Sequence, residues 1–407
     1  MKTFPRSFSN REKTITPVLV FIIIASFLWA MPGCKSVLER QNVRPIVLRD
    51  VPAQRLAYRF EPDAGAPPGN NEAAPDKLAP IQTDFTTRRP DDALLRTVAS
   101  PDGQRALALY GTEDEPSANF RLDMYSSDGK FLRNLTPPTF SCVFPETVQW
   151  SPDGNSITFI AHKKALPAPT PTPPQELTPL LEASPVATPS IAPAFPSVPV
   201  FTTEQIYVCN RDGFDLRPLT SREGLIYFYF SWAPDNHALA ALACKESEWD
   251  EREKQHMLPA GRPRLIALDG SERLLDDRLT GALPVWSPDS SKIATGFDTE
   301  RDMDVMIYDA ATTRPTQARI SLREAMIAAS LAYEQKTSKK SQASTTAASD
   351  ATKNLPPSYN PIVNLEWSSP DKLYFQTAYV RLLQNETINT FQRWHLLVLS
   401  PQAAVIR

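Results

Sequence analysis

Short apolar runs alternate with turn sequences over most of the chain, from about residue 95 onward. The runs are rich in β-branched and aromatic side chains, which is the pattern of strands rather than of helices. Clear examples are residues 156–161, 225–230, 265–268 and 305–308. Gly, Pro, Asn, Asp and Ser separate the runs, so consecutive strands are predicted to pair antiparallel through tight turns.

One turn motif recurs five times between these runs. Its proline presets φ, its aspartate can bond nearby backbone amides, and a following Gly or Asn accepts the left-handed conformation. Each copy therefore predicts a hairpin corner, and four copies carry a tryptophan just before the turn. The copies are Ser100-Pro101-Asp102-Gly103, Trp150-Ser151-Pro152-Asp153-Gly154, Trp232-Ala233-Pro234-Asp235-Asn236, Trp286-Ser287-Pro288-Asp289-Ser290 and Trp367-Ser368-Ser369-Pro370-Asp371.

Each corner is followed by a third apolar run and, in most units, by a second turn and a short fourth run. Four antiparallel strands in a unit that repeats every 40–50 residues or so predict an all-β fold, a β-propeller of four-stranded blades. Residues 54–58 lie one unit upstream of the first clear copy and indicate a degenerate extra blade. Six blades are therefore expected, with five as the alternative. Residues 46–48 and 403–406 are candidates for the strands that close the ring.

The repeat resembles that of TolB-like β-propellers, whose WD40-like PD40 unit carries a Trp-Ser-Pro-Asp-Gly turn and then Ile-Ala-Phe-like and Ile-Tyr-Val-like strands. The resemblance covers about residues 95–407. Ala99 replaces the first tryptophan, Ser290 ends the fourth turn, and Ser369 is an extra residue in the fifth, which leaves the register open at those corners. The resemblance implies a protein of the cell envelope that engages a protein partner and is associated with peptidoglycan.

Two insertions account for the longer gaps between corners. Residues 165–200 are rich in proline and are predicted to be extended and solvated. Residues 320–358 begin with a possible helix at 322–333 and pass into a Ser/Thr/Lys-rich run. Both insertions are predicted to be disordered. The propeller as a whole is expected to span residues 44–407.

The amino terminus predicts export. Basic residues precede an apolar run at about residues 15–31, as in a secretory signal. Met31-Pro32-Gly33-Cys34 resembles a bacterial lipobox, which implies lipidation of Cys34. Residues 1–33 would then be a signal peptide or membrane anchor and 34–43 a linker; an uncleaved anchor and simple secretion are the alternatives. All three place the propeller outside the cytoplasm, and the expected protein is membrane-anchored in the periplasm or at the cell surface.

Composition and the lack of known catalytic motifs argue against several classes of function. Lys and Arg number 43 against 46 Asp and Glu, so no broad basic field exists for nucleic acid. Cys142 and Cys209 could pair, or could remain separate buried thiols. No zinc-protease, nucleophile-elbow, Walker or Cys-x-x-Cys motif occurs. Neither a metal nor a cofactor is therefore expected. The four scattered histidines are His162, His237, His256 and His395.

Several acidic segments have a functional and a structural interpretation. Residues 298–304 alternate acidic residues as a calcium loop does, but they lack its glycine and terminal glutamate. Residues 246–253 occupy the equivalent loop one blade earlier, and Trp249 there could be an exposed contact. Solvated charged loops are predicted for both segments.

The aspartates and tryptophans that recur in the corner motif also have two interpretations. The corner aspartates could form a ring of carboxylates that binds cations or a basic peptide. We predict instead that each bonds its own turn amides, and that the tryptophans pack between adjacent blades. These residues are Asp102, Asp153, Asp235, Asp289 and Asp371, with Trp150, Trp232, Trp286 and Trp367.

The functional hypothesis is a non-catalytic, envelope-anchored scaffold that binds a protein partner. One alternative is a propeller that senses a carbohydrate or an ion. Another is a propeller enzyme that acts on glycans or peptides. The protein is not expected to be an enzyme, because the last repeat reaches the end of the sequence and leaves no room for a catalytic domain.

Overall fold

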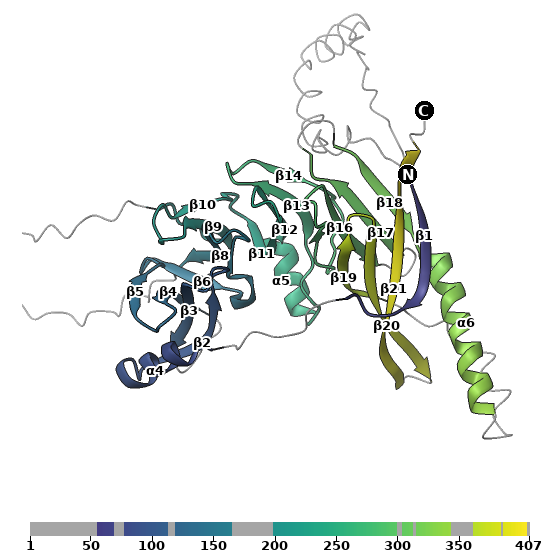
Figure 1. Cartoon of the computed structure of the whole chain (residues 1–407), viewed down its shortest axis with the longest axis horizontal. Coiled ribbons are helices and arrows are strands. Elements are labelled where there is room, and N and C mark those ends of the chain that lie inside the picture. Colours follow the sequence, from purple (N-terminus) through teal and green to yellow (C-terminus); the bar gives the residue numbers. More distant parts are fainter. Residues whose placement is uncertain are drawn as a thin grey trace, which may run out of the picture. The chain divides into compact units, whose positions relative to one another are not determined.

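The computed structural model describes residues 55–68, 77–112, 119–164, 198–298, 303–311, 315–342, 361–383 and 386–404. Within these ranges the chain forms five antiparallel sheets, which follow one another along the sequence (Figure 1). Three α-helices and one 3-10 helix accompany the sheets in the same ranges. The predicted all-β class is therefore confirmed.

Four of the sheets are built from strands that are consecutive in the chain. The first sheet contains β2 (Asp92–Ala99), β3 (Arg105–Thr112), β4 (Arg121–Ser126) and β5 (Phe131–Asn134). The second contains β6 (Phe140–Val143), β7 (Gln149–Trp150), β8 (Ser156–Lys163), β9 (Gln205–Asn210) and β10 (Arg217–Pro218), with the 3-10 helix η1 (Pro145–Thr147) between β6 and β7.

The third and fourth sheets repeat this order. The third contains β11 (Leu225–Trp232), β12 (Ala238–Lys245), β13 (Arg262–Ala267) and β14 (Glu272–Leu274). The fourth contains β15 (Val285–Trp286), β16 (Lys292–Asp298), β17 (Met303–Asp309) and β18 (Gln317–Ser321). The helices are α4 (Ala79–Arg88) before the first sheet, α5 (Glu246–Lys254) between β12 and β13, and α6 (Arg323–Gln342) after β18.

The fifth sheet joins two distant parts of the chain. Its strands are β19 (Ile362–Ser369), β20 (Lys372–Leu383) and β21 (Glu386–Ala404), and β1 (Arg55–Ala64) pairs antiparallel with β21 at the edge (Figure 1). Residues 55–58, which the sequence predicted as part of a sixth blade, therefore belong to the fifth sheet. The described residues form five sheets, as in the five-blade alternative, and the count of six is not confirmed.

The partner of the C-terminal strand also differs from the prediction. Leu56 lies opposite Ala403, whereas residues 46–48 had been predicted for this role and lie outside the described residues. Pairing β1 with β21 gives the sheet its fourth strand and covers an edge of backbone hydrogen-bonding groups that would otherwise be open to another chain.

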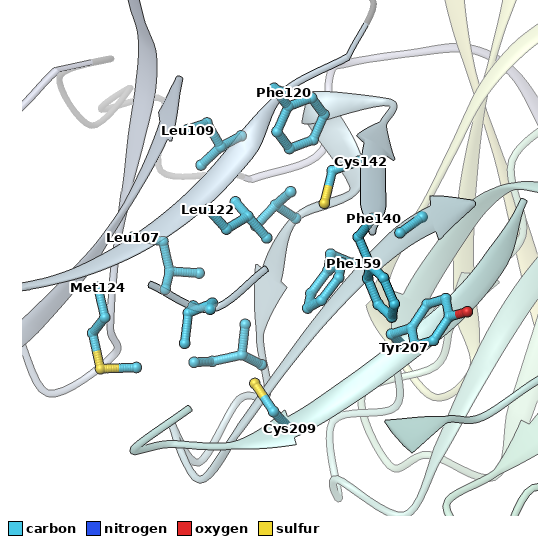
Figure 2. Close-up of a cluster of buried hydrophobic side chains, with 14 of the residues drawn as sticks. Leu107, Leu109, Phe120, Leu122, Met124, Phe140, Cys142, Phe159, Tyr207 and Cys209 are labelled. Atoms are coloured by element: carbon cyan, nitrogen blue, oxygen red, sulfur yellow. The ribbon is translucent and has the colours of Figure 1, made fainter. Parts of the chain in front are cut away.

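Hydrophobic clusters lie between consecutive sheets. Leu107 and Leu122 of the first sheet pack in one cluster with Phe159 and Tyr207 of the second (Figure 2). Similar clusters join the second sheet to the third, the third to the fourth, and the fourth to the fifth. Packing of sheet on sheet is how propeller blades bury both of their faces. This packing explains why their strands are apolar at nearly every position rather than at alternate ones.

The second insertion is not disordered at its start. Residues 317–321 form β18, and residues 323–342 form α6, which is longer than the predicted helix at 322–333. Met326 and Ala329, on one face of this helix, are buried, and Met326 joins the cluster between the fourth and fifth sheets. Burial of this face stabilises a helix that its Ser- and Thr-rich second half would not hold alone.

Most of the other segmental predictions fall outside the described residues. These are the leader at 1–33, the linker at 34–43, Cys34, nearly all of the Pro-rich insertion at 165–197 and the end of the second insertion at 343–358. Within the described ranges, none of the helices combines the length and the apolar character that crossing a bilayer requires.

Candidate functional site

The corner aspartates are occupied by their own turns. Asp102, Asp153, Asp289 and Asp371 each accept the hydroxyl of the serine two residues before, at 2.5–2.6 Å. Asp235 follows Ala233 and accepts the backbone N–H of His237 instead, at 3.1 Å. The bond from Ser100 contributes most to lowering the pKa of Asp102 to about 2. At least one oxygen of each corner carboxylate is therefore bonded within its own turn.

The corners also contact one another. The residues after Asp235 and Asp289 have positive φ, at 65° for Asn236 and 57° for Ser290. Asn236 accepts the backbone N–H of Asp153, and Ser290 accepts that of Asp235, each at 3.0 Å. Asn236 and Ser290 therefore link neighbouring sheets, which a glycine at these positions would not do. The linked corners define one end of the second, third and fourth sheets.

The repeated tryptophans connect each sheet to the one before it. The indole N–H of Trp150 donates to the carbonyl of Val98, and that of Trp286 donates to the carbonyl of Ser231. Trp232 donates to the Thr158 hydroxyl at 2.9 Å. Trp367 is buried, but its indole nitrogen has no partner among the described residues. These four side chains hold the sheets together, so they do not form a ligand site.

The cysteines and histidines do not form a reactive centre within the described ranges. Cys142, Cys209 and Cys244 are buried and unpaired, and burial raises the pKa of the Cys244 thiol to about 11. Cys142 and Cys209 lie within the cluster between the first and second sheets (Figure 2). In the part of the chain that the structure describes, no three His, Cys, Asp or Glu side chains are grouped to hold a metal ion.

One acidic residue of the calcium-like segment is a core residue rather than a loop residue. Asp304 lies in β17 with its side chain 1% exposed and pairs with Arg319 at 2.7 Å and Arg278 at 3.3 Å. Glu300 and Asp302 lie outside the described residues. The prediction of a solvated loop is therefore wrong for Asp304, because sheet pairing extends β17 to Met303.

The other acidic segment is a helix rather than a loop. Residues 246–254 form α5, with Glu246 and Glu248 in the first turn and Arg252 and Lys254 in the last. This distribution suits the helix dipole. The Glu248 carboxylate also accepts the backbone N–H of Lys245, at 2.9 Å, and so caps the helix start. The charge order was visible in the sequence and could have indicated the helix.

Trp249 attaches α5 to the sheets. It is half-buried, and its ring lies 5.5 Å from that of Phe228 and 5.7 Å from that of Phe144. Phe144 has a φ of 58°, which is unusual for a bulky residue and directs the chain into η1. The expectation of an exposed Trp249 is thus wrong, because aromatic side chains of the second and third sheets cover it.

A partly buried ion pair between Glu248 and Arg262 fixes the same helix to β13. Both guanidinium Nη atoms of Arg262 donate to the Glu248 carboxylate, at 2.7 and 2.8 Å. This bidentate pair lowers the pKa of Glu248 to about 2. The side chains are 24% and 20% exposed for Glu248 and Arg262, so water screens them only in part. The helix is therefore a fixed support.

The loop after α5 presents apolar side chains from this support. Met257 is 48% exposed and Leu258 is 83% exposed. The Leu258 carbonyl accepts Nε of Arg252 at 2.8 Å, and the Met257 N–H donates to the Arg252 carbonyl at 2.9 Å. The backbone of this loop is therefore held in place while its side chains face solvent. We call α5 and residues 255–260 together the α5 platform.

Glu248→Gln is expected to loosen the α5 platform without unfolding the protein. Loss of the charged, bidentate partner should cost about 1–3 kcal/mol of local stability. Amide hydrogen exchange over residues 246–260 should accelerate. The matched control is Glu251→Gln, because Glu251 is exposed and, within the described residues, its carboxylate accepts a hydrogen bond from the Gln255 side chain rather than from an arginine. Equal protection in both variants would contradict the role of the ion pair.

Comparisons with known proteins bear on the fold. No family model matches the sequence, and no relative is found among curated proteins. Similar solved structures include TolB from Acinetobacter baumannii, with 12% identity, a TM-score of 0.31, and coverage of 77% of this chain and 55% of TolB. Prolyl oligopeptidase B from Galerina marginata is 9% identical, with a TM-score of 0.42; the match covers 84% of this chain and 41% of the peptidase. Dipeptidyl peptidase 4 from Porphyromonas gingivalis is 10% identical, with a TM-score of 0.35; the match covers 73% of this chain and 46% of the peptidase.

These similarities also correct one expectation. The prediction that the protein is not an enzyme is contradicted, because peptidases stand among the similar structures. Propeller sheets are scaffolds that occur in chains of many functions, so the lack of a catalytic motif in the repeats does not exclude an enzyme. The chain spans 41–55% of the length of the three neighbours named above. The corner repeats and the five sheets packed one on another show that the chain itself has the blade architecture of a β-propeller, the fold that its resemblance to TolB-like repeats predicted.

Proposed function

We propose that this protein is a protein-binding β-propeller and that the α5 platform is its binding site. The observation that carries the proposal is the exposure of Leu258 on a loop whose backbone is held by Arg252. Leu258 is 83% exposed, and a partner that buried this large aliphatic side chain in full would stabilise the complex by about 1.5–3 kcal/mol.

The fixed geometry of the platform supports this role. Binding is weakened when loops and side chains must first be ordered, and a loop that is already ordered avoids most of that cost. Trp249 and the Glu248–Arg262 pair hold the helix, and Arg252 holds the loop. Binding residues on loops placed by a rigid scaffold are the usual arrangement in sheet proteins.

We place this function in the cell envelope. The support is the amino-terminal sequence: basic residues, an apolar run at about 15–31, and Cys34 in a lipobox-like context. In this proposal the propeller is exported, tethered to the membrane through its amino terminus, and meets its protein partner on the extracytoplasmic side.

Site-specific photocrosslinking tests the binding site. A photoreactive amino acid at position 258 of the full chain, expressed in intact cells, is expected to give a discrete adduct with one partner protein. Position 214 is the matched control, because Phe214 is 55% exposed and lies in the hairpin that follows β9. Adducts of equal yield at both positions, or none at 258, would sink the proposal.

One observation favours the alternative of a small-ligand sensor. A cavity of about 250 Å³ lies beside β1 and the fourth sheet, with Leu56, Ile307 and Ala318 on its apolar side and Lys292 and Asp309 among its polar residues. A sensor would show a rise in melting temperature on addition of a sugar or an ion, and that rise would survive substitution of Leu258. Ile307 and Ala318 are buried at this cavity, whereas Leu258 is 83% exposed, so protein binding through Leu258 is the better-supported function.

A further inference from the structure

Leu258 and a second exposed leucine lie in two loops that a backbone bridge joins. Leu283, in the loop between the third and fourth sheets, is 45% exposed. Gly261 and Thr280 exchange both backbone hydrogen bonds at 2.9 Å, so the chain segments on either side of this bridge run antiparallel. We call Met257, Leu258 and Leu283 the apolar tip.

Both loops of the apolar tip are held by hydrogen bonds. The Thr280 hydroxyl donates to the Gly296 carbonyl and accepts the N–H of Ala282. The Thr295 hydroxyl donates to the Ala282 carbonyl at 2.8 Å. A Cβ on Gly281 would lie 3.4 Å from the Pro259 carbonyl oxygen, which shows that the two loops are in contact. The two loops that carry the apolar tip are therefore in contact with each other.

Carboxylates border this surface along α5. The exposed acidic residues of the helix outnumber its one exposed cation, Lys254. Arg262 is paired with Glu248. Arg252 keeps its charge, because its partner is the neutral Leu258 carbonyl, and Lys245 at the N-cap is exposed. Four exposed carboxylates therefore face three cations, and the excess charge is negative. The exposed acidic residues are Glu246, Asp250, Glu251 and Glu253.

We infer that the partner presents a basic amphipathic segment, in which aliphatic or aromatic side chains cover the apolar tip and flanking Lys or Arg side chains face α5. This inference rests on the proposed function and specifies its partner. Complementary charge at the rim of an interface raises the association rate and sets specificity, while burial of the apolar centre supplies affinity. An anionic lipid surface is the wrong occupant, because its headgroups carry the same sign as α5.

Two model peptides test this chemistry in solution. Fluorescein-labelled helical peptides of Leu and Lys, or of Leu and Glu, are titrated into the full chain and followed by anisotropy. The Leu/Lys peptide is expected to bind at least about tenfold more tightly, with affinity falling as salt rises. Leu258→Ser and the double variant Asp250→Lys/Glu251→Lys should each weaken it by about tenfold. Equal binding of the two peptides would overturn the inference.

Matched controls separate charge from unfolding and from nonspecific attraction. Asp91→Lys changes an exposed carboxylate beside α4 and should leave affinity unchanged. Thermal unfolding of all variants should coincide within a few degrees, since surface substitutions of this kind usually alter stability by less than about 0.5 kcal/mol. A loss of affinity in Asp91→Lys as large as that in the double variant would also overturn the inference.

Repeating the crosslinking with the double variant separates the two proposals. If the adduct at position 258 persists at full yield in Asp250→Lys/Glu251→Lys, the tip binds a protein but the basic partner is excluded. If the adduct is lost in that variant and kept in Asp91→Lys, both proposals are supported. If the unsubstituted chain gives no adduct, the proposed function itself fails.

Discussion

Asp63→Asn should lower the free energy of unfolding by about 3 kcal/mol, because it removes the counter-ion of a buried guanidinium. Asp63 accepts Nε and Nη2 of Arg393 at 2.6 and 2.9 Å. The Arg393 side chain is 3% exposed, while that of Asp63 is 43% exposed. The expected loss lies at the lower end of the range for broken buried pairs, since water reaches the carboxylate.

This pair joins segments that lie far apart in the sequence. Asp63 belongs to β1 and Arg393 to β21, and the guanidinium also lies 4.7 Å from the ring of Tyr333 in α6. Asp63 has a φ of 52°, a conformation that asparagine accepts, so the substitution removes charge and leaves the backbone relaxed. Chemical denaturation of the full chain measures the change.

The control is a double variant in which the charge of the partner is also removed. Asp63→Asn combined with Arg393→Met should recover part of the lost stability, because no unpaired charge is then buried. A loss below about 1 kcal/mol in Asp63→Asn alone would show that Arg393 does not depend on this carboxylate.

Acidification should destabilise the same sheet through His395. This side chain is fully buried, and burial together with the charge of Arg393 lowers its pKa to about 4. Its ring bonds the Thr377 hydroxyl at 3.0 Å, and Nδ1 accepts the N–H of Asp63 at 3.3 Å. Nδ1 is therefore the unprotonated nitrogen of a neutral imidazole.

The direction of the pH effect follows from the two pKa values. Between the ordinary histidine pKa of about 6.5 and the folded value of about 4, the unfolded chain binds the proton more readily. The contribution of neutral His395 to the free energy of unfolding is therefore fully present above pH 6.5. It falls as the pH drops toward 4, by about 3 kcal/mol from this residue alone. Denaturation midpoints across this range measure it.

The matched variant is His395→Gln, which keeps polar atoms at the position and does not titrate. Its stability should be lower than that of the unsubstituted protein at pH 7.5, but flatter between pH 6.5 and 4. Parallel pH profiles for the two proteins would exclude His395 as the cause of acid sensitivity and assign it to carboxylates.

Local chemistry explains which parts of the fold were predictable. The corner at Asp153 needs only proline, a serine hydroxyl and a carboxylate within four residues, so its hairpin is evident in the sequence. Repetition of the corner then predicts the sheets. The α5 platform was less accessible, because residues 246–253 have the composition of a charged loop and only their charge order favours a helix.

The candidate site depends on contacts that no local pattern contains. Trp249 was expected to be exposed, and it is covered because Phe144 and Phe228 reach it from two different sheets. Leu258 and Leu283 look like isolated apolar residues in two loops, and the Gly261–Thr280 bridge joins those loops. A site that tertiary packing assembles from separate loops leaves little signal in a single sequence.

By itself, the sequence determined the strand-and-turn repeat, the all-β class and the near balance of basic and acidic residues, since these follow from short-range propensity and composition. Only the tertiary structure decided that residues 55–64 complete the fifth sheet, that Asp304 and His395 are buried, and that residues 246–254 form α5 beneath an exposed Leu258 loop. The physical reason is that burial and strand pairing depend on partners tens to hundreds of residues away, and a residue's own neighbours do not specify them.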